Sequence, residues 1–134
     1  MFDVGFLSDV SRFIDRGPLN PETDRVWINF CLGYGGLPAT PRHLGLIADE
    51  GQRQFPNARW GAVTPAVNHF AFAASGAALG ADASRTGFED TTQLPNGETA
   101  GANARLVEAL VKIIRNSVRD IASPDEARRM LKIE

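Results

Sequence analysis

The sequence is poor in cysteine and histidine, with one cysteine and two histidines among its 134 residues. The lone cysteine, Cys31, excludes an internal disulfide framework and a cysteine-rich zinc module. Neither sign of charge is in excess, because 14 lysines and arginines face 16 aspartates and glutamates. The net charge of −2 therefore gives no electrostatic reason to expect nucleic acid or an anionic membrane as a partner.

Long apolar runs are missing as well. No run approaches the roughly 18 residues that a membrane-spanning helix needs, and the acidic residues near the amino terminus do not fit a secretory signal. With 43% apolar and 22% charged residues, the sequence predicts an ordinary globular protein of the cytoplasm. The length excludes a complete (β/α)8 barrel, which needs roughly 200 residues or more.

Glycine and proline divide the chain into alternating apolar segments. Helical spacing predicts helices over residues 6–15, 65–79 and 103–118, with two more beginning after Thr40 and Ser123. Short β-branched or aromatic runs predict strands over residues 26–32, 60–64 and 83–86. This alternation predicts an α/β fold with a parallel sheet. The run at 26–32 is apolar nearly throughout, which predicts burial on both faces, with Trp27 and Trp60 in the core.

Two adjacent carboxylates, Glu89 and Asp90, follow the third predicted strand, and Arg85 lies just before them. If this strand runs on, side-chain alternation places Arg85 and Glu89 on one face, with Asp90 turned away. In parallel sheets the loops after the strands carry the chemistry, and a carboxylate there can bind a metal or act as a base. The alternative is a solvated loop with a surface ion pair.

Other polar or glycine-rich segments allow two interpretations. The loop Gly33-Tyr34-Gly35-Gly36 can cradle an anion with its N–H groups or simply form a tight connection, and it lacks the lysine of a P-loop. His43 and His69 belong to no HxH or HExxH pattern, which favours surface or packing roles over metal binding. Cys31 has no CxxC partner and is interpreted as an inert core thiol.

One segment is RTGFED at 85–90, followed by Leu94-Pro95 and Gly97-Glu98. It is similar to the pattern R-x-G-x-E-D…LP-x-G of the β-keto acid cleavage enzymes, the family of the 3-keto-5-aminohexanoate cleavage protein, and it is the most specific of several stretches that resemble this family. The other similar stretches are Phe2-Asp3, LGYGGLPATP at 32–41, Trp60, and the closing segments 103–107 and 123–128.

This resemblance implies a TIM barrel that uses zinc and acetyl-CoA. The family converts a β-keto acid and acetyl-CoA into a CoA thioester and acetoacetate. Matched to its motif, Glu89 corresponds to a zinc-binding carboxylate, Asp90 to the proposed general base, and Arg85 to the arginine paired with that base. Residues 1–134 correspond to the C-terminal part of the barrel, about three βα units.

The sequence also departs from the family pattern. Nothing matches the HxH motif that supplies two zinc ligands, and the early serine and threonine loops and the glutamate before the Phe2-Asp3 segment are missing. Phe6 stands where the family often has a histidine, and Thr91 stands where it usually has an asparagine. The segment 60–65 differs from the glycine-rich strand that the family has at this place. We therefore expect a partial or split enzyme that neither retains zinc tightly nor is active alone, and that associates with an N-terminal half-barrel or with itself. The alternative is a non-catalytic α/β remnant, or a small module that binds an acid or CoA.

Overall fold

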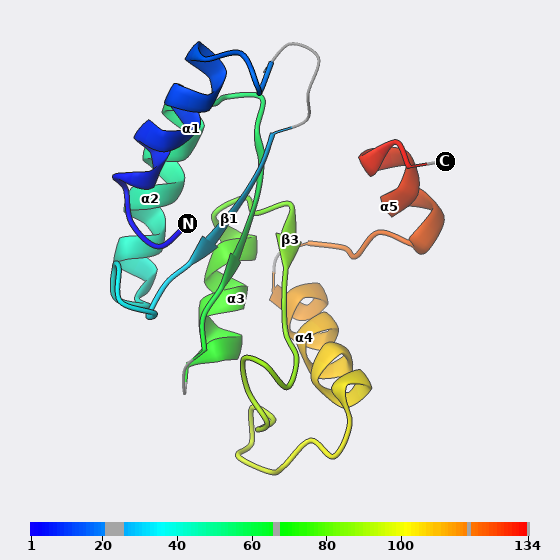
Figure 1. The fold of residues 1–134 in the computed structure, drawn as a ribbon. Helices are drawn as coiled ribbons and strands as arrows, with labels where there is room; N and C mark the ends of the chain where they lie inside the picture. The colour runs from blue at the N-terminus through cyan, green and yellow to red at the C-terminus, as the bar shows by residue number, and fades with distance from the viewer. Residues whose placement is uncertain (21–25, 66–67, 118, 134) are drawn as a thin grey trace.

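The computed structural model describes residues 1–20, 26–65, 68–117 and 119–133. Within these ranges helices and strands alternate along the chain (Figure 1). The elements are α1 (Phe6–Asp15), β1 (Trp27–Cys31), α2 (Pro41–Gln54), β2 (Arg59–Val63), α3 (His69–Ala78), β3 (Ala83–Ser84), α4 (Asn103–Ser117) and α5 (Pro124–Leu131). The predicted order of elements is confirmed.

The three strands form one parallel sheet, in which β2 lies between β1 and β3. Phe30 of β1 is aligned with Ala62 of β2, and Ala62 is aligned with Ser84 of β3. The predicted α/β class and parallel sheet are therefore confirmed. β3 is shorter than the predicted 83–86 because the chain bends away after Ser84 and forms a turn.

Local sequence signals set where two helices begin. The Thr40 hydroxyl accepts a hydrogen bond from His43 N, which caps the first turn of α2. At the start of α5, Ser123 Oγ accepts from Glu126 N while the Glu126 carboxylate accepts from Ser123 N. This reciprocal pair is the capping box that the sequence signals.

Of the three remaining predicted helices, α1 covers the predicted 6–15, and the bounds of α3 and α4 differ only in part from expectation. α3 begins at His69 and ends at Ala78, inside the predicted 65–79, and residues 66–67 lie outside the described residues. α4 covers the predicted 103–118 apart from its last residue, which is also outside them. Beyond α3, Gly80 adopts a φ of 96°, a conformation that favours glycine and ends the helix.

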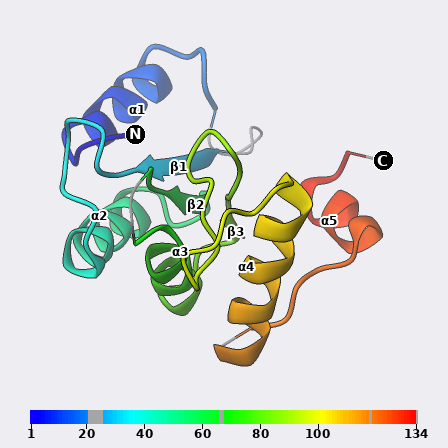
Figure 2. The same ribbon diagram turned by 90° about the horizontal axis from the view of Figure 1, so that it is seen from below.

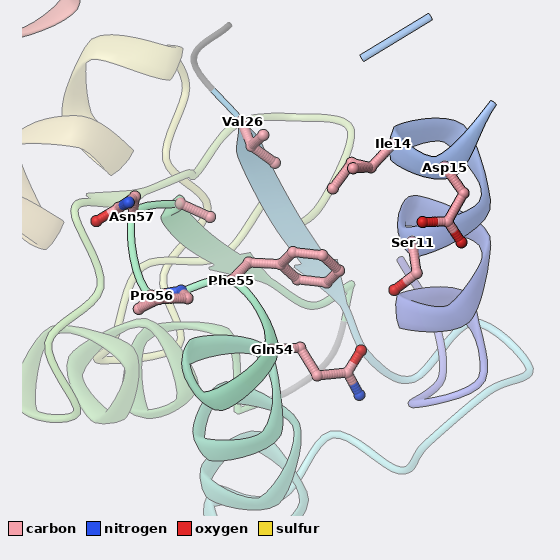
Figure 3. A pocket seen from close by; sticks show the side chains of 9 residues that line it. Ser11, Ile14, Asp15, Val26, Gln54, Phe55, Pro56 and Asn57 are labelled. Carbon is pink, nitrogen blue, oxygen red and sulfur yellow. The ribbon is translucent and has the colours of Figure 1, made fainter. Parts of the chain in front are cut away.

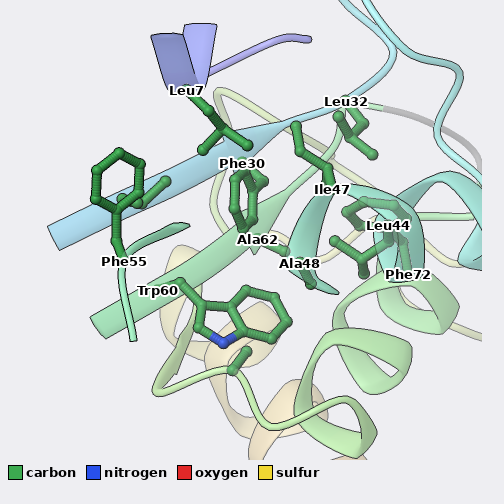
Figure 4. Close-up of a cluster of buried hydrophobic side chains, with 12 residues drawn as sticks. Leu7, Phe30, Leu32, Leu44, Ile47, Ala48, Phe55, Trp60, Ala62 and Phe72 are labelled. Carbon is green, nitrogen blue, oxygen red and sulfur yellow. The ribbon is translucent and has the colours of Figure 1, made fainter. Parts of the chain in front are cut away.

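The main hydrophobic core lies between one face of the sheet and helices α1, α2 and α3 (Figure 4). The face contributes alternate residues of β1 and β2, and each helix contributes its apolar side. Its buried members are Leu7, Ile28, Phe30, Leu32, Leu44, Ile47, Ala48, Phe55, Trp60, Ala62, Phe72 and Ala81. Figure 2 shows α2 and α3 along this face, with α4 next to α3.

At β1 the opposite face of the sheet is much less covered. Along β1, Ile28 and Phe30 are buried, whereas Asn29 and Cys31 are only half-buried and Trp27 is 43% exposed. The prediction that β1 is buried on both faces, with Trp27 in the core, is therefore wrong. The helices of the main core pack on one face only, so the side chains of β1 that alternate to the other face keep contact with water, whereas Val63 of the central strand β2 is buried.

The first residue of the chain extends the sheet beyond β1. The Met1 amino group donates to Asn29 O (2.6 Å), and Met1 O accepts from Cys31 N (2.7 Å). Bonds to the two residues on either side of Phe30 are the pattern of a parallel ladder. Met1 therefore occupies the outer edge of β1 as one residue of a further parallel strand would.

A second, smaller apolar cluster joins α3 to α4. Its buried members are Phe70, Ala73, Ala77, Ala100, Leu106, Leu110 and Ile114. Helix α5 has no buried residue and lies apart from the sheet (Figure 1), although Arg119 in the segment before it donates to Ala81 O (2.8 Å). No helix in the described ranges is long and apolar enough to cross a membrane.

Candidate active site

The candidate site lies where the chain leaves the carboxyl end of β3. The hydroxyl of Ser84, the last residue of this strand, donates to Ala73 O of α3 and so faces the helices. Because successive side chains alternate, Arg85 extends from the opposite, less covered face. The turn that follows brings Asp90 back to Arg85, since Asp90 N bonds to Gly87 O (2.9 Å).

Arg85 and Asp90 form a bidentate ion pair. Arg85 Nε lies 3.0 Å from Asp90 Oδ2, and Arg85 Nη2 lies 2.7 Å from Asp90 Oδ1. The Asp90 side chain is only 1% exposed, whereas that of Arg85 is 45% exposed. The expected proximity of these two residues is confirmed. The interpretation as a solvated surface pair does not describe Asp90, whose carboxylate is buried against the guanidinium.

The turn is fixed from the other side by the start of α4. The Asn103 side chain, at the first residue of this helix, accepts a hydrogen bond from Phe88 N (2.8 Å). Asp90 is therefore positioned by β3, by the turn and by α4 together. A carboxylate held in this way has little freedom to change its orientation, which suits a group that must meet a substrate in one geometry.

Glu89 has different surroundings. Its carboxylate also accepts a hydrogen bond from Arg85 Nη2 (3.1 Å), but its side chain is 78% exposed. β3 ends at Ser84, so the strand alternation that would place Arg85 and Glu89 on one face does not extend to Glu89. The structure thus leaves this carboxylate accessible to a ligand, with one oxygen shared with Arg85.

Two basic or acidic groups of the site have displaced pKa values. The side-chain hydrogen bonds to Asp90 raise the pKa of Arg85 above its usual value, so the guanidinium remains a cation. Tyr34, in the loop after β1, has its pKa raised by desolvation and then by the negative charges of Asp90 and Glu89. No motif in the sequence singles out Tyr34 by itself. The signal that would have identified Tyr34 is its position after the carboxyl end of β1, because the turn after β3 lies at the same end of the strands.

Backbone conformation and a close backbone contact explain why glycine occupies three positions of the loop 33–36. Gly33 and Gly35 have φ angles of 94° and 97°, which side chains other than glycine rarely adopt. A Cβ on Gly36 would overlap Phe2 O, and this carbonyl oxygen accepts a hydrogen bond from Leu37 N (2.8 Å). These contacts favour the interpretation of a tight connection over that of an anion cradle.

The histidines and the cysteine lie in separate places. His43 Nδ1 is 2.7 Å from Thr40 Oγ1 at the start of α2, and His69 Nδ1 is 2.7 Å from Thr64 O at the start of α3. Cys31, predicted as a buried core thiol, is half-buried at the end of β1. Among the described residues, no group of three or more histidine, cysteine, aspartate or glutamate side chains could hold a metal ion. The donors described here therefore do not by themselves fit a zinc site, and Glu89 offers one carboxylate.

A pocket of about 380 Å³ lies at the other end of the sheet (Figure 3). It is lined by the end of α1, the start of β1 and the segment between α2 and β2, with Asp15, Val26 and Phe55 among its residues. It lies at the amino ends of the strands, whereas the Arg85–Asp90 pair follows the carboxyl end of β3. It is therefore separate from the candidate site.

Comparison with known proteins identifies the family. A sequence model described as beta-keto acid cleavage enzyme matches residues 1–133. The chain belongs to this family. The resemblance seen in the RTGFED segment and its neighbours is thereby confirmed.

Curated relatives in the β-keto acid cleavage family include two acetyl-CoA transferases and a cleavage enzyme. The chain is 30% identical over 135 residues to the 3,5-dioxohexanoate:acetyl-CoA acetone transferase of Paraburkholderia graminis, covering 99% of the chain and 42% of that protein. It is 30% identical over 146 residues to the 3-keto-5-aminohexanoate cleavage enzyme of Acetoanaerobium sticklandii, and this match covers 99% of the chain and 46% of that protein. It is 29% identical over 133 residues to the 3-dehydrocarnitine:acetyl-CoA trimethylamine transferase of Rhizobium meliloti, and this match covers 98% of the chain and 42% of that protein. The chain thus spans less than half the length of these relatives.

Proposed function

We propose that residues 1–134 are the C-terminal part of a TIM-barrel β-keto acid cleavage enzyme, acting in a partial or split form. The observation that carries the proposal is the bidentate Arg85–Asp90 pair, buried on the aspartate side, at the carboxyl end of a parallel strand. Enzymes with this barrel place their chemistry at that end of the strands. The less covered face of β1 supports the assignment to a barrel, because in a closed barrel the face opposite the helices becomes the packed interior.

The proposed reaction exchanges acyl groups between a β-keto acid and acetyl-CoA. The bond between the keto carbon and the CH2–COO⁻ unit breaks, and that unit receives the acetyl group to give acetoacetate. The remaining acyl group leaves as its CoA thioester, so no oxidant or reductant is needed. Asp90 acts as the general base, and Arg85 is the residue that positions it, through two hydrogen bonds.

We assign Glu89 to a zinc site of the complete enzyme as one carboxylate ligand. Its exposure leaves it available, and its hydrogen bond to Arg85 holds it beside Asp90. Zinc in catalytic sites usually has three protein ligands, and the other two must come from outside the described residues. A complementary segment, the missing part of the barrel, is therefore part of the proposal.

The test is complementation of the chain with that missing part. The tagged chain is co-expressed with the portion of the A. sticklandii relative that the alignment leaves uncovered, and acetyl-CoA-dependent formation of acetoacetate from 3-keto-5-aminohexanoate is measured. Asp90→Asn keeps the side-chain volume and is expected to abolish turnover. The matched control is Asp125→Asn, which removes an exposed carboxylate of α5 that pairs with Arg128. Unchanged turnover in Asp90→Asn would rule out the base, and a complex without any turnover would favour the non-catalytic alternative.

A further inference from the structure

Three exposed aromatic side chains form a cluster beside the carboxyl end of β1. Phe2, Phe6 and Tyr34 are 40%, 43% and 49% exposed. The Phe2 ring contacts the other two edge to face, with centroid distances of 6.0 Å to Phe6 and 6.5 Å to Tyr34. These three residues are called the aromatic cluster below. Apolar rings that water reaches gain free energy when they are covered, so a contiguous set of them marks a binding surface.

The backbone holds the aromatic cluster in place. Phe2 O accepts a hydrogen bond from Leu37 N (2.8 Å), which ties the start of the chain to the loop after β1. This loop is closed by Gly33 N, which donates to Leu37 O (3.0 Å). Tyr34 lies between Gly33 and Gly35, both of positive φ, so the backbone sets the turn that presents its ring. A surface held in this way loses little conformational entropy when a ligand covers it.

The aromatic cluster and the Arg85–Asp90 pair lie at the same end of the sheet (Figure 1). Only β2 separates β1 from β3, and neighbouring strands are about 4.8 Å apart, so β1 and β3 are about 10 Å apart. The pKa of Tyr34 is raised by desolvation and then by the charges of Asp90 and Glu89, so its phenol is within electrostatic reach of the pair. A short-chain β-keto acid with its reacting carbons at Asp90 can therefore reach the cluster with its substituent.

We infer that the aromatic cluster binds the substituent on the keto carbon and selects β-keto acids in which this substituent is apolar and uncharged. Aromatic rings also attract cations, but they do so through their faces. In an edge-to-face pair the positive edge of one ring covers the negative face of its neighbour, so two faces of the cluster are already occupied.

The carboxylates around the aromatic cluster are engaged as well. Glu89 and Asp90 both accept hydrogen bonds from Arg85, and the Asp3 side chain accepts one from Gly5 N (2.9 Å). A cationic substituent would have to share these partners, whereas an apolar one gains by covering the rings. The inference rests on the proposed function, because it names the substrate class of that same site.

The test compares two β-keto acids that differ in one group. 3-Keto-5-methylhexanoate has a methyl group where 3-keto-5-aminohexanoate has an ammonium group, so the two are matched in size. In the complemented enzyme we expect kcat/KM to be about tenfold higher for the methyl compound, the lower end of what one methyl group contributes in a closed apolar pocket. Tyr34→Ala and Phe6→Ala should each bring this ratio close to one, whereas Tyr34→Phe, which keeps the ring, should preserve it.

A binding measurement separates this inference from the proposed function. The chain with isotope-labelled phenylalanine and tyrosine is titrated with each compound in the absence of acetyl-CoA, and NMR follows the ring signals. The methyl compound should shift the signals of the aromatic cluster at about tenfold lower concentration than the amino compound, and Asp90→Asn should leave these shifts in place. The control Phe13→Ala removes an exposed ring of α1 outside the cluster and should change neither measurement.

The outcomes are distinct. Circular dichroism verifies that each variant folds. Absence of the ring shifts, preference for the amino compound, an equal effect of Phe13→Ala, or a dimer of the chain that Tyr34→Ala dissociates would overturn the inference. Ring shifts with the expected preference in a protein without turnover would contradict the proposed function and leave the binding surface standing.

Discussion

The Arg85–Asp90 pair predicts that the two partners contribute unequally to stability. The Asp90 side chain is almost fully buried, whereas nearly half of the Arg85 side chain is in water. Arg85→Ala would leave a buried carboxylate without its two hydrogen bonds. Asp90→Ala would leave a guanidinium that water can solvate. The arginine substitution should therefore destabilise the fold more than the aspartate substitution does.

The magnitudes follow from that difference in exposure. Breaking a fully buried pair costs about 3–5 kcal/mol, and the half-exposed guanidinium reduces this, so we expect Arg85→Ala to lower the free energy of unfolding by about 2–4 kcal/mol. For Asp90→Ala we expect about 1–2 kcal/mol, because two hydrogen bonds of about 0.5–1.5 kcal/mol net are lost while water solvates the remaining guanidinium. The double variant should be more stable than Arg85→Ala, because the unpaired carboxylate is then gone.

Urea unfolding followed by tryptophan fluorescence measures all three variants. Trp60 is buried in the main core and reports its loss. Lys112→Ala, which removes the cation of an exposed pair with Glu108 in α4, is the control and should change stability by less than about 0.5 kcal/mol. A larger loss in Asp90→Ala than in Arg85→Ala, or a double variant less stable than both, would refute the reasoning.

Two other predictions concern the glycine loop and a titrating carboxylate. Gly36→Ala places a Cβ against the Phe2 carbonyl and should lower the free energy of unfolding in urea by about 1–3 kcal/mol. The control is Gly45→Ala in α2, where a Cβ meets nothing within 4 Å, and it should raise the free energy of unfolding by about 0.5–1 kcal/mol. Equal effects of the two substitutions would contradict the close approach of Phe2 to Gly36. Hydrogen bonding from Arg53 lowers the pKa of Glu50 to about 2 from 4.5, so its contribution to stability is present above pH 4.5 and is lost as the pH falls toward 2. Carboxyl NMR titration should show the pKa of Glu50 returning toward 4.5 in Arg53→Ala, and a titration that does not move would exclude Arg53 as the cause.

The features predicted correctly from sequence are those that local residues determine. Thr40 caps α2 and Ser123 begins a capping box, because each hydroxyl needs only the N–H groups of its own first turn. The apolar period of each helix and the short β-branched runs likewise predict the alternation of helices and strands. The same holds for the nearness of Arg85 and Asp90, which lie five residues apart around one turn.

The features missed depend on what packs beyond the local segment. Trp27 lies in an apolar run that is typical of a core strand, yet the described helices cover only the other face of its strand. Glu89 would share a face with Arg85 if β3 continued, but the turn at Gly87 ends the strand first. No pattern in the sequence predicts that Met1 bonds beside Phe30, because that contact joins residues far apart along the chain. The assignments of Glu89, Asp90 and Arg85 to chemical roles stay predictions.

The two faces of β1 impose different limits on how this strand can vary. Ile28 and Phe30 point into the core, whereas Trp27 and Asn29 point away from it. In a random library selected for folding alone, tolerance of polar residues along β1 should rise and fall every second position. A selection that also demands assembly with the complementary segment should remove this period, since both faces are then constrained. Comparing the two selections separates the positions that keep the chain folded from those that let it join a larger protein.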